Sequence, residues 1–306
     1  MKNPKFKTRN PKFSAGAAIL LALWALFLLS ALVISWALDI NSRLTVSSEG
    51  NRTLKAEAVA CSGAEVALNP TIKPDSPNLK GRLNNGATYD ARITGEGGRI
   101  DLNWVVLPQN IEILRNYLQN KGIDLNERDL MIDALQDWIE PNTGLHRLNA
   151  PPETDDYHPA HLPLARVDEV KKVAGWAEFT SVPGWDDDFT VNTRQGIDLT
   201  WASRNVLLAL PGLTNDMVDR FLQVRQGPDG IDGTEDDTLI ESNENAAALL
   251  GLNQQQITQL QPFLSPGPVA IFRVVSVGTA GKAKRTVQMV FRRIGVMPQV
   301  MTWREF

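Results

Sequence analysis

The residues best suited to chemistry are the carboxylates of two short acidic segments. The tighter segment, residues 227–237, holds five of them between glycines: Asp229, Asp232, Glu235, Asp236 and Asp237. Ca²⁺ takes about six to eight hard oxygen ligands, and glycines let backbone carbonyls turn toward the ion. Like charges this dense repel one another unless a cation is bound. The segment predicts a calcium site, although its spacing is not that of an EF-hand and a solvated acidic turn is the alternative.

A second acidic segment, residues 137–156, is looser. Its candidate ligands are Asp137, Glu153, Asp155 and Asp156. His158 and His161 follow directly, and a His-x-x-His pair near carboxylates could bind zinc, but Pro159 opposes a helix that would place both rings on one face. The chain has no His-Glu-x-x-His, Gly-x-Ser-x-Gly or phosphate-binding loop. We therefore expect exposed loop histidines and no enzyme.

These segments lie far behind a long apolar stretch, residues 17–38, which contains no charged residue. At about 1.5 Å per residue it forms roughly 33 Å of helix, enough to cross a bilayer. The leader in front of it lacks acids and carries a series of cations: Lys2, Lys5, Lys7, Arg9 and Lys12. This asymmetry predicts a single-pass anchor with a cytoplasmic N-terminus and with the chain after Asp39 across the membrane.

Two simpler interpretations of this stretch remain open. A secretory signal also starts with basic residues, and Ser35-Trp36-Ala37 could be its cleavage site, but its apolar region spans only about 7–15 residues. A plain membrane anchor is the default from hydropathy alone.

The helix should continue beyond the membrane, because apolar residues keep a helical spacing to Leu68 and no proline intervenes before Pro70. Glycines between residues 87–94 and 98–105 predict a β-hairpin. Residues 111–264 have mainly helical patterns, and two further strands are expected at 269–277 and 286–294, with a turn between them. The structure of the last residues, 300–306, stays unassigned.

The helical region contains a weak internal repeat. Residues 100–104, Ile-Asp-Leu-Asn-Trp, return as Ile-Asp-Leu-Thr-Trp at 197–201, and Met-Ile-Asp at 131–133 returns as Met-Val-Asp at 217–219. A third helix is expected after each copy, ending at Gly175 and at Gly251. The matches keep their order, which favours duplication of a small helical unit.

Charge argues against a nucleic-acid partner. The turn Leu210-Pro211-Gly212 resembles a helix-hairpin-helix turn, which binds phosphate through backbone amides. Such modules need basic neighbours. Here acids outnumber Arg220 and Arg225 in the surrounding residues, and the net charge of the chain is −4. The single cysteine, Cys61, excludes an intrachain disulfide.

The junction Ser14-Ala15-Gly16-Ala17, at the cytoplasmic edge of the apolar stretch, resembles the cleavage site of type IV pilin-like precursors. Most pilin-like subunits carry Glu as the fifth residue after this site, and here Leu21 occupies that position. A buried Glu in lipid persists only when it is paired. Its absence is typical of the K-type minor pseudopilins of type II secretion systems (general secretion pathway protein K family).

Two segments of the helical region resemble the same family. The first is Leu-Gln-Asp-Trp-Ile at 135–139, followed by Thr-Asp-Asp-Tyr at 154–157. The second is Gly-Ile-Asp-Leu at 196–199, followed by Val-Leu-Leu-Ala-Leu-Pro-Gly at 206–212. The resemblance implies an α+β fold, in which a long N-terminal α-helical spine joins a pilin-like antiparallel β-sheet interrupted by a large, internally duplicated helical insertion. It also implies that the insertion binds calcium (Ca2+), as one or two ions held by the acidic segments.

The resemblance implies a division of the chain into a prepilin leader at 1–16, a transmembrane and filament helix at 17–40, a pilin-like core at 41–105 and 265–306, and a helical insertion at 106–264. Prepilin peptidase would cut between Gly16 and Ala17, leaving an N-methylated Ala17. The protein would lie in the inner membrane with a periplasmic C-terminal domain. Its partners would be the I- and J-type minor pseudopilins and the inner-membrane assembly platform.

The implied function is that of a non-enzymatic minor pseudopilin at the tip of the type II secretion pseudopilus. It would initiate assembly of the pseudopilus and support protein export across the outer membrane. Leu21 offers no acid for a salt bridge to a subunit above, which suits a tip position. The alternative is a minor pilin of a type IV pilus or DNA-uptake filament, which shares the N-terminal chemistry.

Overall fold

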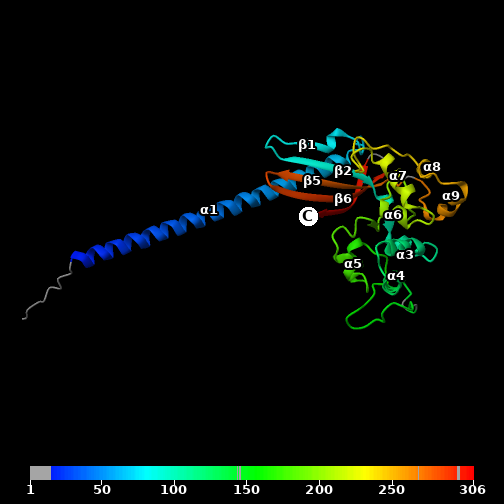
Figure 1. Cartoon of the computed structure of the whole chain (residues 1–306), viewed down its shortest axis with the longest axis horizontal. Helices are drawn as coiled ribbons and strands as arrows, with labels where there is room; N and C mark the ends of the chain where they lie inside the picture. The colour runs from blue at the N-terminus through cyan, green and yellow to red at the C-terminus, as the bar shows by residue number, and fades with distance from the viewer. Residues whose placement is uncertain (1–14, 143, 145, 268, 295–296) are drawn as a thin grey trace, which may run out of the picture. The chain divides into compact units, whose positions relative to one another are not determined.

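The computed structural model describes residues 15–142, 144, 146–267, 269–294 and 297–306 (Figure 1). Nearly all of the predicted leader, residues 1–14, lies outside the described residues. The chain divides into two compact units, Met1–Leu54 and Lys55–Phe306. Most of the features described below belong to the second unit.

The predicted continuous N-terminal helix is confirmed. Helix α1 runs from Ala15 to Leu68 without a break (Figure 1). It ends where Pro70 would interrupt it, and the Asn69 side chain accepts a hydrogen bond from the Thr71 backbone. The part from Ile19 to Leu38 leaves its large apolar side chains exposed. Among the described residues, α1 is the one helix long and apolar enough to cross a membrane.

The second unit contains an antiparallel sheet in the order β1-β2-β5-β6-β7. Its strands are β1 (Lys80–Arg82), β2 (Thr88–Gly95), β5 (Ile271–Ala280), β6 (Ala283–Ile294) and β7 (Met297–Glu305). Strands β2 and β5 are neighbours in the sheet although the helical region separates them in the chain. The α+β fold with a helical region inserted into the sheet is thereby confirmed.

The C-terminal part of α1 packs closely on one face of this sheet. The side chains of Ala56, Ala60, Ala64 and Ala67 are fully buried. A Cβ atom at Gly278 of β5 would lie 2.6 Å from the Ala60 nitrogen and closer still to the Ala56 carbonyl oxygen. Small residues on both sides therefore set the distance between the helix and the sheet.

The predicted hairpin of residues 87–94 and 98–105 is wrong in its second strand. Only Ile100–Asp101 (β3) forms a strand, and it pairs in parallel with Phe189–Thr190 (β4) in a separate two-stranded sheet. The chain then turns into helix α2 (Leu102–Val105), because the Asp101 carboxylate accepts hydrogen bonds from the backbones of Asn103 and Trp104 at 3.0 and 3.1 Å. This is an N-cap, which favours helix over strand.

At the other end of the chain, the predicted β5–β6 hairpin is confirmed with longer strands than expected. The turn is reduced to the residues around Gly281, whose φ of +63° lies in the left-handed region. The unassigned C-terminal segment forms β7, which pairs with β6 through a register shift at Val290 and Phe291. The short strand β1 was also not expected.

The helical region between β2 and β5 has its own hydrophobic core, in which Trp176, Tyr117 and Phe221 are among the largest buried side chains. Its helices are α3 (Ile111–Asn120), α4 (Leu125–Ile139), α5 (Ala177–Ser181), α6 (Arg204–Ala209), α7 (Asn215–Arg225), α8 (Asn243–Leu249) and α9 (Gln254–Leu260), with 3-10 helices at Val167–Lys172 and Gln261–Phe263.

The two copies of the repeat share local geometry. Ile100 pairs in parallel with Phe189, and Ile197 forms a parallel bridge to Leu264. In each copy the following Asp is buried and accepts a hydrogen bond from the backbone nitrogen two residues later. A helix pair then follows, α3–α4 in one copy and α6–α7 in the other.

The contact of α1 with the sheet leads to a first prediction. Replacement of Gly278 by Ala should destabilise the fold by about 1–3 kcal/mol, because the added methyl group forces the helix away from β5. Denaturant titration of the full chain in detergent, followed by tryptophan fluorescence, measures the change. Gly267→Ala is the control, since no atom of the described residues lies within 4 Å of a Cβ placed there. Equal stability of the two variants would contradict the packing described here.

Candidate metal centre

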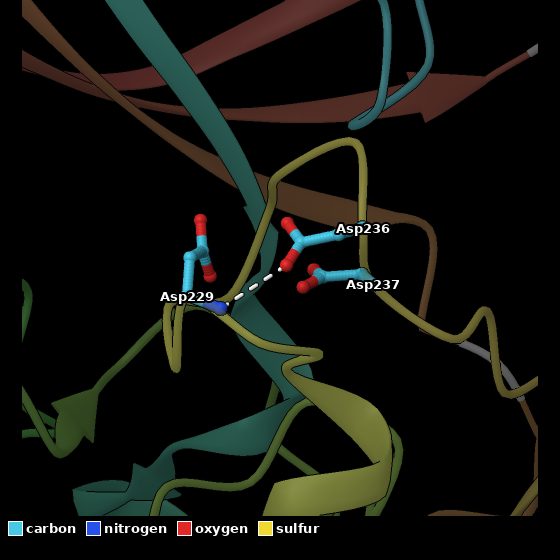
Figure 2. Close-up of side chains that lie close together, drawn as sticks. All are labelled: Asp229, Asp236 and Asp237. Atoms are coloured by element: carbon cyan, nitrogen blue, oxygen red, sulfur yellow. Dashed lines mark hydrogen bonds between the residues drawn. The ribbon is translucent and has the colours of Figure 1, made fainter.

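The acidic loop of residues 227–237 follows α7 and turns sharply back on itself (Figure 2). Three of its residues have positive φ angles, Gly227 at +62°, Gly230 at +68° and Gly233 at +85°, which L-residues with a Cβ rarely adopt. A Cβ at Gly227 would also lie 2.5 Å from the Asp236 carbonyl oxygen. The glycines thus allow the two ends of the loop to meet.

This turn brings the carboxylates of Asp229, Asp236 and Asp237 together, as Figure 2 shows. One oxygen from each lies within 4.8 Å of the others. The Asp229 nitrogen donates a hydrogen bond to Asp236 Oδ2 at 3.1 Å, and the Gly233 nitrogen donates one to Asp237 Oδ2 at 2.6 Å. Among the acids, histidines and cysteines of the described residues, these three carboxylates are the ones that lie close enough together to share a cation.

The surroundings shift the pKa values of two of these carboxyls in opposite directions. Hydrogen bonds from the Thr234 hydroxyl and the Asp229 backbone lower the pKa of Asp236. Burial raises the pKa of Asp237, and the nearby Asp232 carboxylate raises it further. A hard divalent cation would relieve both the desolvation of Asp237 and the repulsion within the group. The donor set therefore fits Ca²⁺.

Asp232 and Glu235, predicted as ligands with these three, have other positions. Asp232 accepts hydrogen bonds from Arg225 Nε and Nη2 at 2.9 and 3.0 Å, so that its carboxylate ties the loop to the end of α7. The Arg225 side chain is buried and also donates to the Ala202 carbonyl at 2.8 Å. Glu235 is exposed and stands outside the group of three.

The structure does not bring together the four acids of the first segment. Asp137 accepts hydrogen bonds from the Arg147 backbone at 3.0 and 3.1 Å and lies 2.8 Å from His146 Nδ1. Glu153 lies 2.8 Å from His161 Nε2 and 3.9 Å from His158 Nδ1. Asp155 and Asp156 are exposed in the turn between Thr154 and Tyr157.

The two histidines of the His-x-x-His pair thus face a carboxylate. The hydrogen bond to Glu153 raises the pKa of His161, and a second one to the Glu140 carbonyl adds to this effect. A metal-binding histidine must be neutral, which a raised pKa opposes. The geometry favours an ion pair at this position.

One polar cluster was not anticipated from the sequence. Glu96 is fully buried in the turn after β2 and forms a two-bond ion pair with Arg273 of β5 at 2.8 and 2.9 Å. Burial alone would raise the pKa of Glu96, but the charges of Arg273 and Arg99 outweigh it and lower the pKa. Burial and the neighbouring Arg273 lower the pKa of Arg99 to about 10. In the sequence, the single indication that Glu96 forms a buried ion pair is its position between two glycines, Gly-Glu-Gly.

No family model matches this chain, and no curated protein matches it either. Among solved structures, it is similar to a chain of the crystal structure of the GspK-GspI-GspJ complex from the type 2 secretion system of enterotoxigenic Escherichia coli. The TM-score is 0.58 at 15% sequence identity, and the match covers 86% of this chain and 99% of the other. At this identity the likeness shows a shared fold.

The anchor of the acidic loop gives a second prediction. Arg225→Met should lower the free energy of unfolding by about 2–3 kcal/mol, because Asp232 would lose its partner. The loss is smaller than for a fully buried pair, because the Asp232 side chain is partly solvated. Urea unfolding of the full chain measures the cost. The control is Arg220→Met on the exposed side of the same helix, which should change stability little. If both substitutions had the same effect, Arg225 would not anchor the loop.

Proposed function

We propose that this chain is the K-type minor pseudopilin of a type II secretion system, placed at the tip of the pseudopilus. The observation that carries the proposal is the fold shared with a chain of the GspK-GspI-GspJ complex over 99% of that chain. The likeness includes the inserted helical region, since it covers 86% of this chain. The signals at the N-terminus of the sequence support the same conclusion independently.

Helix α1 supplies the membrane part of the mechanism. Its apolar segment holds the chain in the inner membrane, with the basic leader in the cytoplasm and the second unit in the periplasm. Prepilin peptidase cuts after Gly16, at the start of α1, where no atom of the described residues lies within 4 Å of the position a Cβ would take. Ala17 then becomes the methylated first residue. The apolar helices of neighbouring subunits associate side by side.

Leu21 gives the reason for a tip position. In most pilin-like subunits a Glu at this place pairs with the amine of the adjacent subunit, and a charge in lipid without such a partner is costly. Leu21 is apolar and exposed, so the chain enters the filament without that pair. It would begin the assembly on the inner-membrane platform, with the I- and J-type minor pseudopilins as partners and without catalysis.

Calcium is the second part of the proposal. Asp229, Asp236 and Asp237 would hold one Ca²⁺ and would thereby fasten the two ends of the acidic loop. The ion supplies positive charge where desolvation raises the pKa of Asp237. A second ion at the first acidic segment has less support, because Asp137 and Glu153 there already have other partners.

The processing step gives a third prediction. Gly16→Val should block cleavage, so that the chain keeps its leader and migrates more slowly on a gel, and protein secretion should fall to the level of a deletion strain. Gly50→Ala is the control within the same helix, because the part of the chain that the structure describes places no atom within 4 Å of the added Cβ. Normal secretion with the leader retained would contradict the proposal. Loss of DNA uptake with intact secretion would instead favour a minor pilin of an uptake filament.

Calcium removal gives a fourth prediction. A chelator should lower the thermal midpoint of the full chain by about 5–10 °C, the shift expected when a ligand at about a hundredfold its Kd is withdrawn. Asp237→Asn should abolish this response, yet in chelator it should be at least as stable as the wild type, because it removes a desolvated charge. Glu235→Gln, a change of an exposed acid in the same loop, should keep the response.

The sign of the pH effect follows from the same residue. Since the folded-state pKa of Asp237 is raised above 3.8, ionisation of this carboxyl lowers stability as the pH rises through that pKa. Calcium should remove this loss. If chelator leaves the thermal midpoint of the wild-type chain unchanged at neutral pH, the calcium proposal is wrong.

A further inference from the structure

One face of the five-stranded sheet carries α1, and a single helix cannot cover it. A helix is about 10 Å wide, whereas five strands at about 4.8 Å spacing place the outer two roughly 19 Å apart. The residues that pack on α1 come from β2, β5 and β6, among them Ile93, Val274 and Met289. The strips of sheet on either side of the helix therefore need other cover.

The two sides differ in this respect. Next to β1, the segment after α1 covers the sheet, with Ile72 and Leu79 only 5% and 3% exposed. Next to β7, no segment of the described residues does the same, and Val300 and Trp303 remain 44% and 37% exposed. Both point to the α1 side, since Trp303 is paired with Met289 and Val300 with Phe291, which are buried beneath the helix.

Carboxylates border this uncovered strip. Glu57, Cys61 and Glu65 follow one another at intervals of four residues and so share one stripe of α1. Glu305 lies on the same face of the sheet, opposite Val287. Burial is the largest cause of the raised pKa of the Cys61 thiol, and the three carboxylates raise this pKa further. All three therefore lie near the thiol. Arg285 is the cation at one end, where Glu57 and Glu305 line a hollow of about 170 Å³.

We propose that this strip, the β7 groove, receives an amphipathic α-helix of a neighbouring subunit of the filament, with an apolar stripe flanked by Lys or Arg. The groove is defined by Glu57, Cys61, Glu65, Val300, Trp303 and Glu305. The inference rests on the proposed function and names the surface through which that function would recruit a partner. Apolar side chains of the helix would cover Val300 and Trp303, and its cations would meet the three carboxylates.

A helix fits this surface better than an added β-strand. The exposed apolar side chains project from the face of the sheet, whereas a strand would pair with the edge of β7 and leave Val300 and Trp303 uncovered. The acids of α1 also border the face. An occupant of the groove must therefore lie next to α1, at the distance at which helices pack on each other.

Cys61 supplies a direct test, because it is the only cysteine of the chain and is half-buried at the groove. The full chain would be expressed in membranes, alone and together with the I- and J-type minor pseudopilins of the same cell, and alkylated with a maleimide. We expect the partners to slow alkylation of Cys61 at least about tenfold by burying it in the interface. This comparison of wild-type proteins needs no substitution in the groove.

Variants then test the chemistry of the groove. Trp303→Glu, and separately Glu57→Lys with Glu65→Lys, should weaken association at least about tenfold and restore alkylation. Leu83→Glu is the matched control, a residue with 38% exposure beside β1, and should leave association unchanged. A cysteine placed at Lys80 in a Cys61→Ser chain should react equally fast with and without partners.

The outcomes separate the inference from the proposed function. If the partners co-purify but Cys61 reacts as fast as before, the β7 groove is not the interface, and the proposed function stands. Association that persists in both groove variants would indicate another surface, such as the edge of β7, and would also overturn the inference. If the partners do not associate and Gly16 is not processed, both proposals fail.

Discussion

Helix α1 has to satisfy two environments in one unbroken element, and the rest of the structure depends on how it meets the second. Up to Leu38 it carries apolar side chains all round and no charge, as a helix in lipid requires. From Ala56 onward it presents alanines and Gly63 to a sheet that offers Gly278 in return. Small residues on both surfaces allow the close approach that fixes the helix on β5.

The helical region is added to this framework without disturbing the sheet. It leaves after Gly95 of β2 and returns at Phe272 of β5, and these two residues are register partners in adjacent strands. The buried pair of Glu96 and Arg273 joins the two points of departure and return. Such a pair contributes little net stability but costs much when one partner is lost, so it favours a single arrangement of the two parts.

Local sequence patterns predicted the parts of the fold that local interactions decide. The C-terminal end of α1 and the β5–β6 hairpin follow from periodicity, proline and glycine. The segment after Gly98 was misjudged because Asp101 also accepts hydrogen bonds from Thr193 and Arg194, far along the chain. Strand β7 pairs with β6 through a register shift, so its sequence lacks the regular alternation of apolar and polar residues that would predict a strand.

The candidate site was predictable to a similar degree. Composition and glycines pointed to the loop of Asp229, Asp236 and Asp237, but no pattern reveals that Arg225 engages Asp232 or that His161 engages Glu153. The central claim, that α1 is a processed filament helix, is tested most directly by the mass of the N-terminal peptide of the chain purified from membranes. The account predicts a peptide that begins at N-methylated Ala17. A peptide that begins at Met1, or one that begins at Asp39 behind a cleaved signal, would contradict it.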